Sequence, residues 1–283
     1  MLKKILIAII LLIGVALVVN RLFFSGSTQV SVSQNEQKGK QVTPSPRVTK
    51  SSSQEELLGK IKNIFFETDP DTDFGIAIYD LKNDNYFGYN DTTIQHAASV
   101  SKVLTGSYLL KKVEDGEIDL NEKMGTYNVE FNLKQLINQS NNISWGMIDD
   151  RLGIEPQNDF AHSLGLTSVD FDENLMSPQD ATMLFVKLYQ GEILSEPYQR
   201  KLFSYMQGTE TENLITLAIP KSIPFYHKTG LFEGEVHDVA IIDHPEHPFV
   251  LSIFTVNKLY PDYEGRAKLI QKIAAEVYAF FAQ

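Results

Sequence analysis

The sequence predicts an α+β fold: an antiparallel sheet flanked by helices, with an all-helical lobe inserted in the middle of the chain. Strand patterns occur at residues 74–79 and 86–89, and they return only at 224–229, 234–242 and 249–256. The chain between these two groups of strands has helical patterns. An order of helix, two strands, many helices, three strands and a final helix indicates a sheet assembled from both ends of the chain.

The first elements follow from apolar spacing and turn residues. Residues 54–68 carry apolar side chains at helical intervals, after three serines that can cap a helix. The first two strands flank residues 80–84 (DLKND), which are typical of a hairpin turn. A helix is then predicted at residues 99–113, and it ends at Glu114-Asp115-Gly116.

Five helical segments fill the middle of the chain, and an apolar helix closes it. The five segments are 133–138, 144–152, 157–163, 178–189 and 197–206, the last two strands are joined by a turn at 243–248, and the final helix is 267–281. No internal repeat is evident, so we expect one globular domain at residues 54–283.

The first 24 residues predict a membrane segment. Residues 5–19 are uncharged and almost wholly apolar, and residues 22–24 extend the apolar stretch. A cleaved signal peptide would use the small residues 25–27 at its cut, whereas an uncleaved anchor needs about 20 apolar residues. We favour a single-pass anchor in the cell membrane, with its two lysines in the cytoplasm and the rest of the chain outside. Residues 25–53, which have hardly a large apolar side chain, are then a flexible extracytoplasmic linker.

Composition narrows the chemistry of the domain. The chain has no cysteine, which excludes thiol catalysis and cysteine-held metals. Its net charge of -11 argues against nucleic acid, or an anionic lipid surface, as the main partner. A metal site of His237, Asp238, His244 and His247 is an alternative, but three of these lie on or beside a predicted turn, where such residues are common. We therefore expect no metal and no other cofactor.

Ser99 and Lys102 form the only S-x-x-K pattern in the chain. On a helix this spacing places both side chains on one face, so the lysine amine can reach the serine hydroxyl. A serine becomes a nucleophile when an adjacent base takes its proton, and a lysine can be that base if burial and cationic neighbours keep it neutral. The other interpretation is a helix cap, Ser99, with a solvated lysine on the next turn.

Two further motifs have both a chemical and a structural interpretation. Ser140-Asn141-Asn142 lies between two helical segments, where a hydroxyl and an amide can relay a proton and hold a carbonyl, or simply form a turn. Lys228-Thr229-Gly230 lies in a strand pattern. Its lysine and threonine can receive a carboxylate, and its glycine lets a ligand approach the backbone. Otherwise it is an edge-strand lysine before a turn.

Taken in this order, the three motifs identify a family. The chain resembles the penicillin-recognising serine hydrolases, and most closely the class A β-lactamases, which carry S-x-x-K, S-D-N and K-T-G. The resemblance covers about residues 57–281 and includes GIAIYDLKNDNYFGYN before Ser99 and DDRLG after Asn142. It implies a β-lactamase/transpeptidase-like fold and a serine hydrolase that works through an acyl-enzyme.

The resemblance also implies a role for each motif residue. Ser99 would attack the carbonyl, Lys102 would take or relay its proton, and Ser140 would pass a proton to the departing nitrogen. Asn142 would hold the acyl side chain, and Lys228, Thr229 and Gly230 would form the carboxylate site. The oxyanion would lie between the backbone N–H groups of Ser99 and Leu231. Lys102 and Lys228 would make the pocket locally positive and lower each other's pKa.

The sequence departs from class A enzymes in the loop that clears the acyl-enzyme. Those enzymes carry a glutamate there in an E-x-x-L-N motif, whereas residues 167–177 form a shorter loop without it. Asp172 and Glu173 are candidate substitutes, and the other interpretation of both is a solvated loop carboxylate. Residues 119–131 are also abbreviated, and Asn141 replaces the usual aspartate of the second motif.

These features predict that acylation is retained and that deacylation is impaired. The expected substrates are β-lactams, or D-alanyl amide or ester groups of cell-wall polymers. The alternative is a non-catalytic protein that binds wall fragments or a partner at the cell surface. A histidine-based triad is not expected from His96, His162 and His227, because strand alternation should turn His227 away from Lys228.

Overall fold

The computed structural model describes residues 51–257, 259 and 262–283, and these belong to one compact unit. The predicted anchor, residues 1–24, and nearly all of the predicted linker lie outside the described residues, so both stay predictions. Within the described part of the chain, no helix is long and apolar enough to cross a bilayer.

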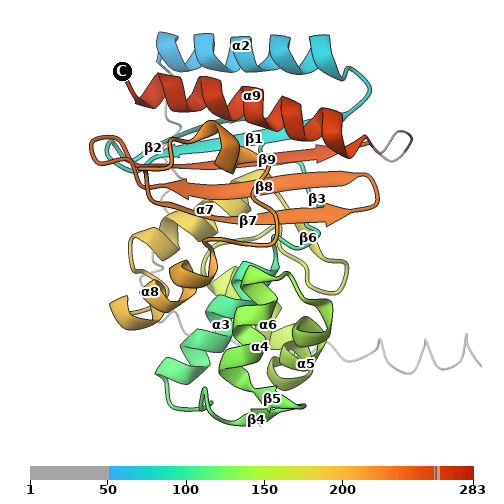
Figure 1. The fold of residues 1–283 in the computed structure, drawn as a ribbon, viewed down its shortest axis with the longest axis vertical. Helices are drawn as coiled ribbons and strands as arrows, with labels where there is room; N and C mark the ends of the chain where they lie inside the picture. The colour runs from blue at the N-terminus through green and yellow to red at the C-terminus, as the bar shows by residue number, and fades with distance from the viewer. Residues whose placement is uncertain (1–50, 258, 260–261) are drawn as a thin grey trace, which may run out of the picture. The chain divides into compact units, whose positions relative to one another are not determined.

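A five-stranded antiparallel sheet forms the centre of the fold, in the order β2-β1-β9-β8-β7 (Figure 1). The strands are β1 (Asp73–Asp80), β2 (Asn85–Tyr89), β7 (Phe225–Phe232), β8 (Glu235–Ile242) and β9 (Phe249–Val256). Strands from both ends of the chain pair, because β1 lies between β2 and β9. The predicted assembly of the sheet is confirmed, and β7 is left as an edge strand.

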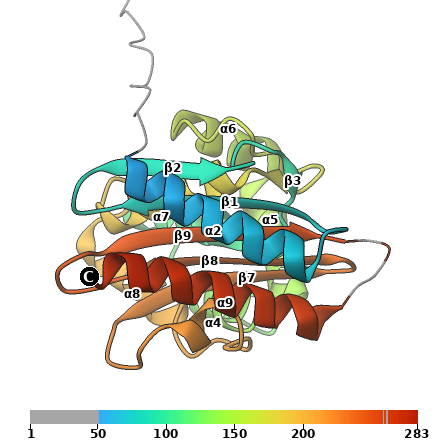
Figure 2. The same cartoon turned by 90° about the horizontal axis from the view of Figure 1, so that it is seen from above.

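Two helices cover one face of the sheet. Figures 1 and 2 show α2 (Ser52–Thr68) and α9 (Tyr263–Phe281) side by side above the strands. Ile61 and Phe65 from α2 and Ile273 from α9 are fully buried in one apolar cluster with the sheet. The N-terminus of α2 has a capping box in which Ser51 and Gln54 satisfy each other's backbone N–H groups.

The other face carries the inserted helical lobe. Helix α7 packs directly against β1, β8 and β9, and the remaining middle helices lie beyond it (Figure 1). The middle helices are α3 (Lys102–Glu114), α4 (Val129–Asn138), α5 (Asn142–Leu152), α6 (Ile154–Ser163), α7 (Pro178–Tyr189) and α8 (Glu196–Tyr205). All of the predicted helical segments are present, so the α+β prediction is confirmed for the described residues.

The helix predicted to begin at Ser99 begins instead at Lys102. Residues 97–101 form a turn, hereafter the nucleophile turn, in which Ala98 has a φ of 49°. The Val100 and Val103 N–H groups donate to carbonyls three residues back, and the first α-helical hydrogen bond runs from the Thr105 N–H to the Ser101 carbonyl at 3.2 Å. Two short strands that the sequence does not predict, β3 (Gln95–His96) and β6 (Leu175–Met176), pair beside this turn. Two residues are too few to produce a strand pattern.

Candidate active site

The three motifs come together at the junction of the sheet and the helical lobe. Ser99 lies in the nucleophile turn, Ser140 lies between α4 and α5, and Lys228 lies on β7. The Lys102 Nζ is 3.0 Å from the Ser99 Oγ, and the Lys228 Nζ is 2.8 Å from the Ser140 Oγ. The Lys102 Nζ also lies 3.5 Å from the Ser140 Oγ. A continuous polar path therefore joins Ser99, Lys102, Ser140 and Lys228.

Asn174 holds the nucleophile turn in place. Its side-chain amide donates to the Ala98 carbonyl at 2.9 Å, and its side-chain oxygen accepts from the Ser101 hydroxyl at 2.6 Å. Its backbone carbonyl accepts from the Ala97 N–H at 2.7 Å. Asn174 itself has a φ of 52°, a conformation that asparagine tolerates better than most residues. The sequence analysis missed this residue, and an asparagine at a loop tip was the only signal.

Lys102 is completely buried, and its surroundings suit a neutral amine. Its Nζ lies 2.5 Å from the Ser140 carbonyl oxygen and 2.6 Å from the Asn142 Oδ1, and 4.8 Å from the centre of the Trp145 ring. Burial lowers the pKa of Lys102 to about 8, although the charges of Glu210 and Asp149 raise it. A neutral amine can donate to those two oxygens and still accept the Ser99 proton with its lone pair.

The Lys228 side chain extends from β7 toward Ser140 and is only 2% exposed. Besides the Ser140 hydroxyl, its amine contacts the Thr229 carbonyl at 3.1 Å. Burial lowers the pKa of Lys228 to about 7 and the charge of Lys102 lowers it further, while Glu210 and Asp238 raise it. Two buried amines therefore lie close together in a protein whose net charge is -11.

Ser140 is held between the two lysines in a strained backbone conformation. Its φ is 51°, which is uncommon for serine, and its carbonyl and hydroxyl oxygens are engaged by Lys102 and Lys228 respectively. Asn141, which stands where class A enzymes have aspartate, caps α5 by accepting from the Ser144 N–H at 2.9 Å. Asn142 contacts Lys102, so it lies within the site.

Gly230 lets β7 approach the nucleophile turn. A Cβ at this position would lie 2.8 Å from the Ala97 carbonyl oxygen and 3.2 Å from the Ala98 Cβ. The structure thus gives a reason for the glycine within the fold itself, and the approach of a ligand to this backbone stays a prediction. The close packing sets the edge of β7 directly against the turn that carries Ser99.

Two backbone N–H groups are available at this contact. Within the described chain, the Ser99 N–H makes no hydrogen bond. The His227 N–H points away from β8, because it donates to the Met206 carbonyl at 3.0 Å. Every second residue of a strand points its N–H the same way, so the Leu231 N–H also faces the free edge. Thr229 lies between His227 and Leu231 and is buried.

The loop carboxylates make no contact with Ser99 or Lys102. Asp172 and Glu173 are both exposed, and the Asp172 carboxylate accepts from Asn158 on α6 at 3.4 Å. Among residues 51–257 and 262–283, no carboxylate lies within hydrogen-bonding distance of the Ser99 hydroxyl or the Lys102 amine. Asp149, which the sequence analysis missed, acts on Lys102 only through its charge. Its carboxylate accepts from Gln157 at 3.0 Å.

The histidines do not form a triad with Ser99. His227 lies on the opposite face of β7 from Lys228, as predicted, with its Nδ1 3.0 Å from Asp238 and its Nε2 3.2 Å from Glu212. His162 contacts the Val169 carbonyl, and His96 contacts Glu235 at 3.1 Å. No group of three or more histidines and carboxylates in the described residues can hold a metal ion, so the alternative metal site does not form.

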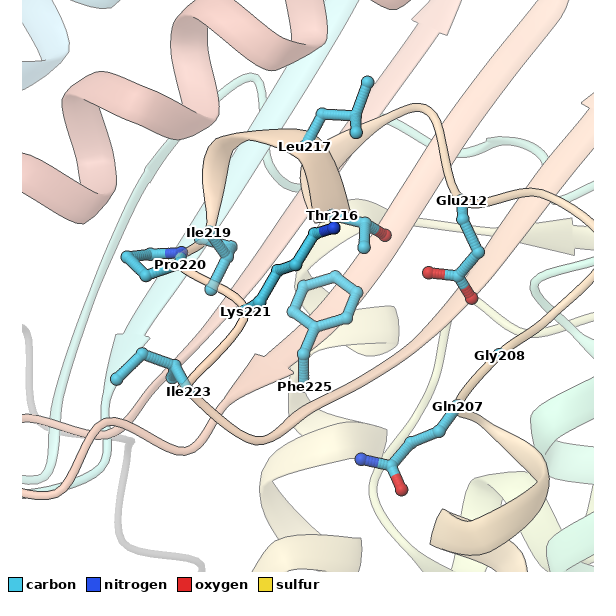
Figure 3. A pocket seen from close by; sticks show the side chains of 10 residues that line it. All are labelled: Gln207, Gly208, Glu212, Thr216, Leu217, Ile219, Pro220, Lys221, Ile223 and Phe225. Atoms are coloured by element: carbon cyan, nitrogen blue, oxygen red, sulfur yellow. The ribbon is translucent and has the colours of Figure 1, made fainter.

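A large surface hollow lies beside this site rather than in it (Figure 3). Its volume is about 670 Å³, and residues 207–225 line it. Ile219, Pro220 and Ile223 lie at one end, and Glu212 lies at the other (Figure 3). Since Glu212 also contacts His227, the hollow adjoins the back of β7, not the face that carries Lys228.

Comparison with known proteins identifies the family. The model of the β-lactamase enzyme family matches residues 56–281. No curated protein sequence matches the chain significantly. A mutant of PBP-A, solved as an acyl-enzyme complex with penicillin G, is 25% identical over 81% of this chain and 97% of its own, with a TM-score of 0.74.

Two β-lactamases share the fold at lower identity. The class A enzyme described as that of the last common ancestor of Gram-negative bacteria is 19% identical, covers 80% of this chain and 99% of its own, and has a TM-score of 0.75. A β-lactamase from Xanthomonas campestris pv. campestris is 17% identical, with coverages of 80% and 97% and the same TM-score of 0.75. With its motifs, its fold and the family match over residues 56–281, the chain belongs to the β-lactamase enzyme family and has the fold of the penicillin-recognising serine hydrolases.

Proposed function

We propose that this protein is a serine hydrolase that forms an acyl-enzyme on Ser99 outside the cytoplasm. Its substrates are β-lactams, or D-alanyl amide or ester groups of cell-wall polymers. The observation that carries this proposal is the polar path from Ser99 through Lys102 and Ser140 to Lys228. A nucleophile, a buried amine without an ion pair and a second hydroxyl in series have the geometry of acyl transfer.

In the proposed reaction, neutral Lys102 takes the proton of the Ser99 hydroxyl as the Ser99 Oγ bonds to the substrate carbonyl. The oxyanion accepts hydrogen bonds from the Ser99 and Leu231 N–H groups. The bond from the carbonyl carbon to the leaving nitrogen or oxygen then breaks. Ser140 gives its proton to the leaving atom, and the lysine amines replace that proton. Water finally hydrolyses the ester and returns a proton to Ser99.

Deacylation is proposed to be slow. Among the described residues, no carboxylate lies beside Ser99 to activate a water. Asp172 and Glu173, the two candidates in the loop, are exposed. A neutral lysine remains as the nearest base. The adduct formed with a penicillin should therefore last longer than one that a loop carboxylate helps to hydrolyse.

The location and the natural substrate are linked in this proposal. An N-terminal anchor at residues 1–24 and a linker at 25–53 would keep the domain at the outer surface of the membrane, within reach of wall polymers. A mutant of PBP-A, 25% identical to this chain, was solved as an acyl-enzyme complex with penicillin G, which makes a penicillin a suitable probe for this chain.

The test is covalent labelling of the full chain in detergent. We expect a fluorescent penicillin or a fluorophosphonate to add one equivalent, measured by intact mass, and the Ser99→Ala variant to add none. Ser107→Ala is the matched control, because this buried hydroxyl on α3 donates to the Val103 carbonyl and lies outside the polar path. Absence of an adduct with both probes, or labelling that survives Ser99→Ala, would contradict the proposal. Undiminished wall binding without labelling would favour the non-catalytic alternative.

A further inference from the structure

His96 connects the sheet to the residue that holds the nucleophile turn. It lies on β3 and pairs with Leu175 of β6, the residue that follows Asn174. The His96 Nδ1 lies 3.1 Å from the Glu235 Oε2, and its Nε2 lies 3.2 Å from the Asn174 Nδ2. The Glu235 side chain, at the start of β8, is only 2% exposed. A series of hydrogen bonds therefore runs from β8 through the His96 ring to Asn174.

The partners of the Asn174 side chain determine the tautomer of His96. The Ala98 carbonyl can only accept, so the Asn174 NH₂ group must face it, and the Asn174 oxygen is left to accept from Ser101. The same NH₂ group faces the His96 Nε2, which must therefore accept as well. A histidine that accepts through Nε2 is neutral and carries its ring proton on Nδ1, where it donates to Glu235.

The backbone and the ring plane of His96 are also fixed by the sheet. The His96 carbonyl accepts from the His237 Nε2 at 3.0 Å, and the His237 Nδ1 accepts from the Thr255 N–H at 3.1 Å. Burial lowers the pKa of His237 to about 4, so this ring is neutral and makes both contacts. The ring of Phe232, the last residue of β7, packs against the His96 ring with 4.9 Å between their centres. The sheet therefore sets the position of the His96 Nε2.

Asn174 transmits this position to the backbone that carries the nucleophile. Its NH₂ group donates to the Ala98 carbonyl, which belongs to the same peptide unit as the Ser99 N–H. The two groups of a trans peptide point in opposite directions, and the described residues contain no cis peptide bond. The hydrogen bond that turns the Ala98 carbonyl toward Asn174 therefore turns the Ser99 N–H away from it. That N–H is one of the two donors of the proposed oxyanion site.

We propose that His96 is a positioning residue for acyl transfer: its Nε2 lone pair orients the Asn174 amide, and the amide aims the Ser99 N–H at the oxyanion. This inference rests on the proposed acylation of Ser99. Without an acceptor at the Nε2 position, one N–H of Asn174 loses its partner and the amide is free to rotate away from the Ala98 carbonyl. The peptide between Ala98 and Ser99 can then turn, and the oxyanion loses one of its donors.

Two substitutions separate the two hydrogen bonds of the His96 ring. The glutamine Oε1 reaches about as far as the histidine Nε2 and can accept from Asn174, whereas an asparagine side chain reaches only the Nδ1 position. With p-nitrophenyl propionate and the full chain in detergent, His96→Asn should lower the acylation rate constant at saturating ester by about 10-fold or more, since losing one oxyanion donor costs about 10²-fold. The ester concentration that gives half the maximal rate should change little. His96→Gln should restore most of the rate.

His162→Asn is the matched control, because it removes an exposed imidazole that contacts the Val169 carbonyl. Its acylation rate should equal that of the wild type. The final amount of adduct per chain, measured by intact mass, gives the folded fraction of each variant, so every rate constant refers to folded protein. A wild-type rate in His96→Asn, or a His96→Gln variant as slow as His96→Asn, would overturn the positioning role.

The tautomer of His96 provides a test that does not depend on activity. In the full chain labelled with ¹⁵N-histidine, the ring signals that are absent from His96→Gln belong to His96. Long-range ¹H–¹⁵N correlation should show a proton on Nδ1 and none on Nε2. A proton on Nε2 would overturn the positioning role, because that nitrogen could not accept from Asn174. Acylation by the ester that is unaffected by Ser99→Ala would overturn the proposed function instead.

Discussion

His227 and Lys228 are neighbours on β7, but their side chains lie on opposite faces in opposite electrostatic surroundings. His227 is completely buried between two carboxylates, Asp238 and Glu212. Burial lowers its pKa, but these charges outweigh the effect and raise the pKa to about 9. Lys228 is equally buried, forms no ion pair with any described residue and lies beside a second amine, and its pKa falls to about 7.

In the proposed mechanism, this difference separates a structural cation, His227, from an amine of the active site, Lys228. Asp238 and Glu212 offset the desolvation of the His227 charge, so removing either carboxylate would leave a buried charge partly uncompensated. Nothing comparable repays the burial of Lys102 and Lys228, and the fold carries two amines that lose their protons easily. Perturbation by burial without a partner is the pattern expected of a site that needs a neutral base.

The largest effect should come from Lys102→Met, which removes the base but keeps an unbranched side chain. Acylation of Ser99 should fall about 10³-fold. The free energy of unfolding should stay within about 1 kcal/mol of the wild type. The variant no longer bears the cost of burying the amine, and this gain offsets the cost of leaving the Ser140 and Asn142 oxygens without a donor. Acylation kinetics and urea denaturation measure the two quantities.

The difference in the free energy of unfolding between the wild type and Lys102→Met should change with pH in a defined direction. Because the pKa of Lys102 falls from 10.5 to about 8 on folding, burying its charge costs stability below pH 8, and the cost disappears as the pH rises to 10.5. The wild type should therefore gain stability relative to Lys102→Met over this range. A loss of several kcal/mol in the variant at pH 7 would show that Lys102 is a structural cation like His227.

Asp238→Asn should lower stability and leave acylation nearly unchanged, the reverse of the outcome expected for Lys102→Met. It leaves the buried His227 cation with Glu212 alone, so the free energy of unfolding should fall by about 3 kcal/mol while acylation by the folded protein hardly changes. Glu212 is the partly exposed carboxylate that contacts His227, so Glu212→Gln should lower the free energy of unfolding by only about 1 kcal/mol.

The stability contributed by the His227 charge depends on pH in the opposite direction to that of Lys102. The pKa of His227 rises from 6.5 to about 9 on folding, so the contribution of its charge is complete below pH 6.5 and is lost as the pH rises through 9. The penalty of Asp238→Asn should shrink over the same window, as measured by urea denaturation at a series of pH values. A penalty independent of pH would mean that the imidazole is neutral.

A smaller effect is expected from Gly230→Ala, which tests the contact between β7 and the nucleophile turn. The added Cβ would lie 2.8 Å from the Ala97 carbonyl oxygen, so one of the two segments must move. We expect a loss of about 1–2 kcal/mol in the free energy of unfolding and slower acylation.

Gly146→Ala is the matched control, because a Cβ at that position in α5 meets no atom within 4 Å. It should stabilise the protein by roughly 0.5–1 kcal/mol, as expected for alanine in a helix interior. Acylation in Gly230→Ala at the wild-type rate would show that the close approach of β7 does not position Ser99.

The sequence predicted the sheet, the main helices and the identity of the motif residues, because each of these leaves a periodic or local pattern. It placed the start of α3 three residues too early, since a left-handed Ala98 has no signature in the sequence. It also did not predict the close approach of Gly230 to Ala97, because the two residues are far apart in the sequence.

Residues that act across the fold left still less trace. Asn174 reaches the nucleophile turn only because β3 and β6 pair. In the sequence it is an ordinary polar residue in a loop. By contrast, strand alternation was enough to separate His227 from Lys228, because that geometry is local.

The most direct test of the account is the pH dependence of acylation of Ser99 by a neutral ester, whose binding does not depend on a substrate charge. Neutral Lys102 is required as the base, so the rate constant should rise with pH and reach half its maximum near pH 8, well below the 10.5 of an ordinary lysine. A rate that rises without a break to pH 10, or one that does not depend on pH while Ser99→Ala abolishes the reaction, would contradict the account.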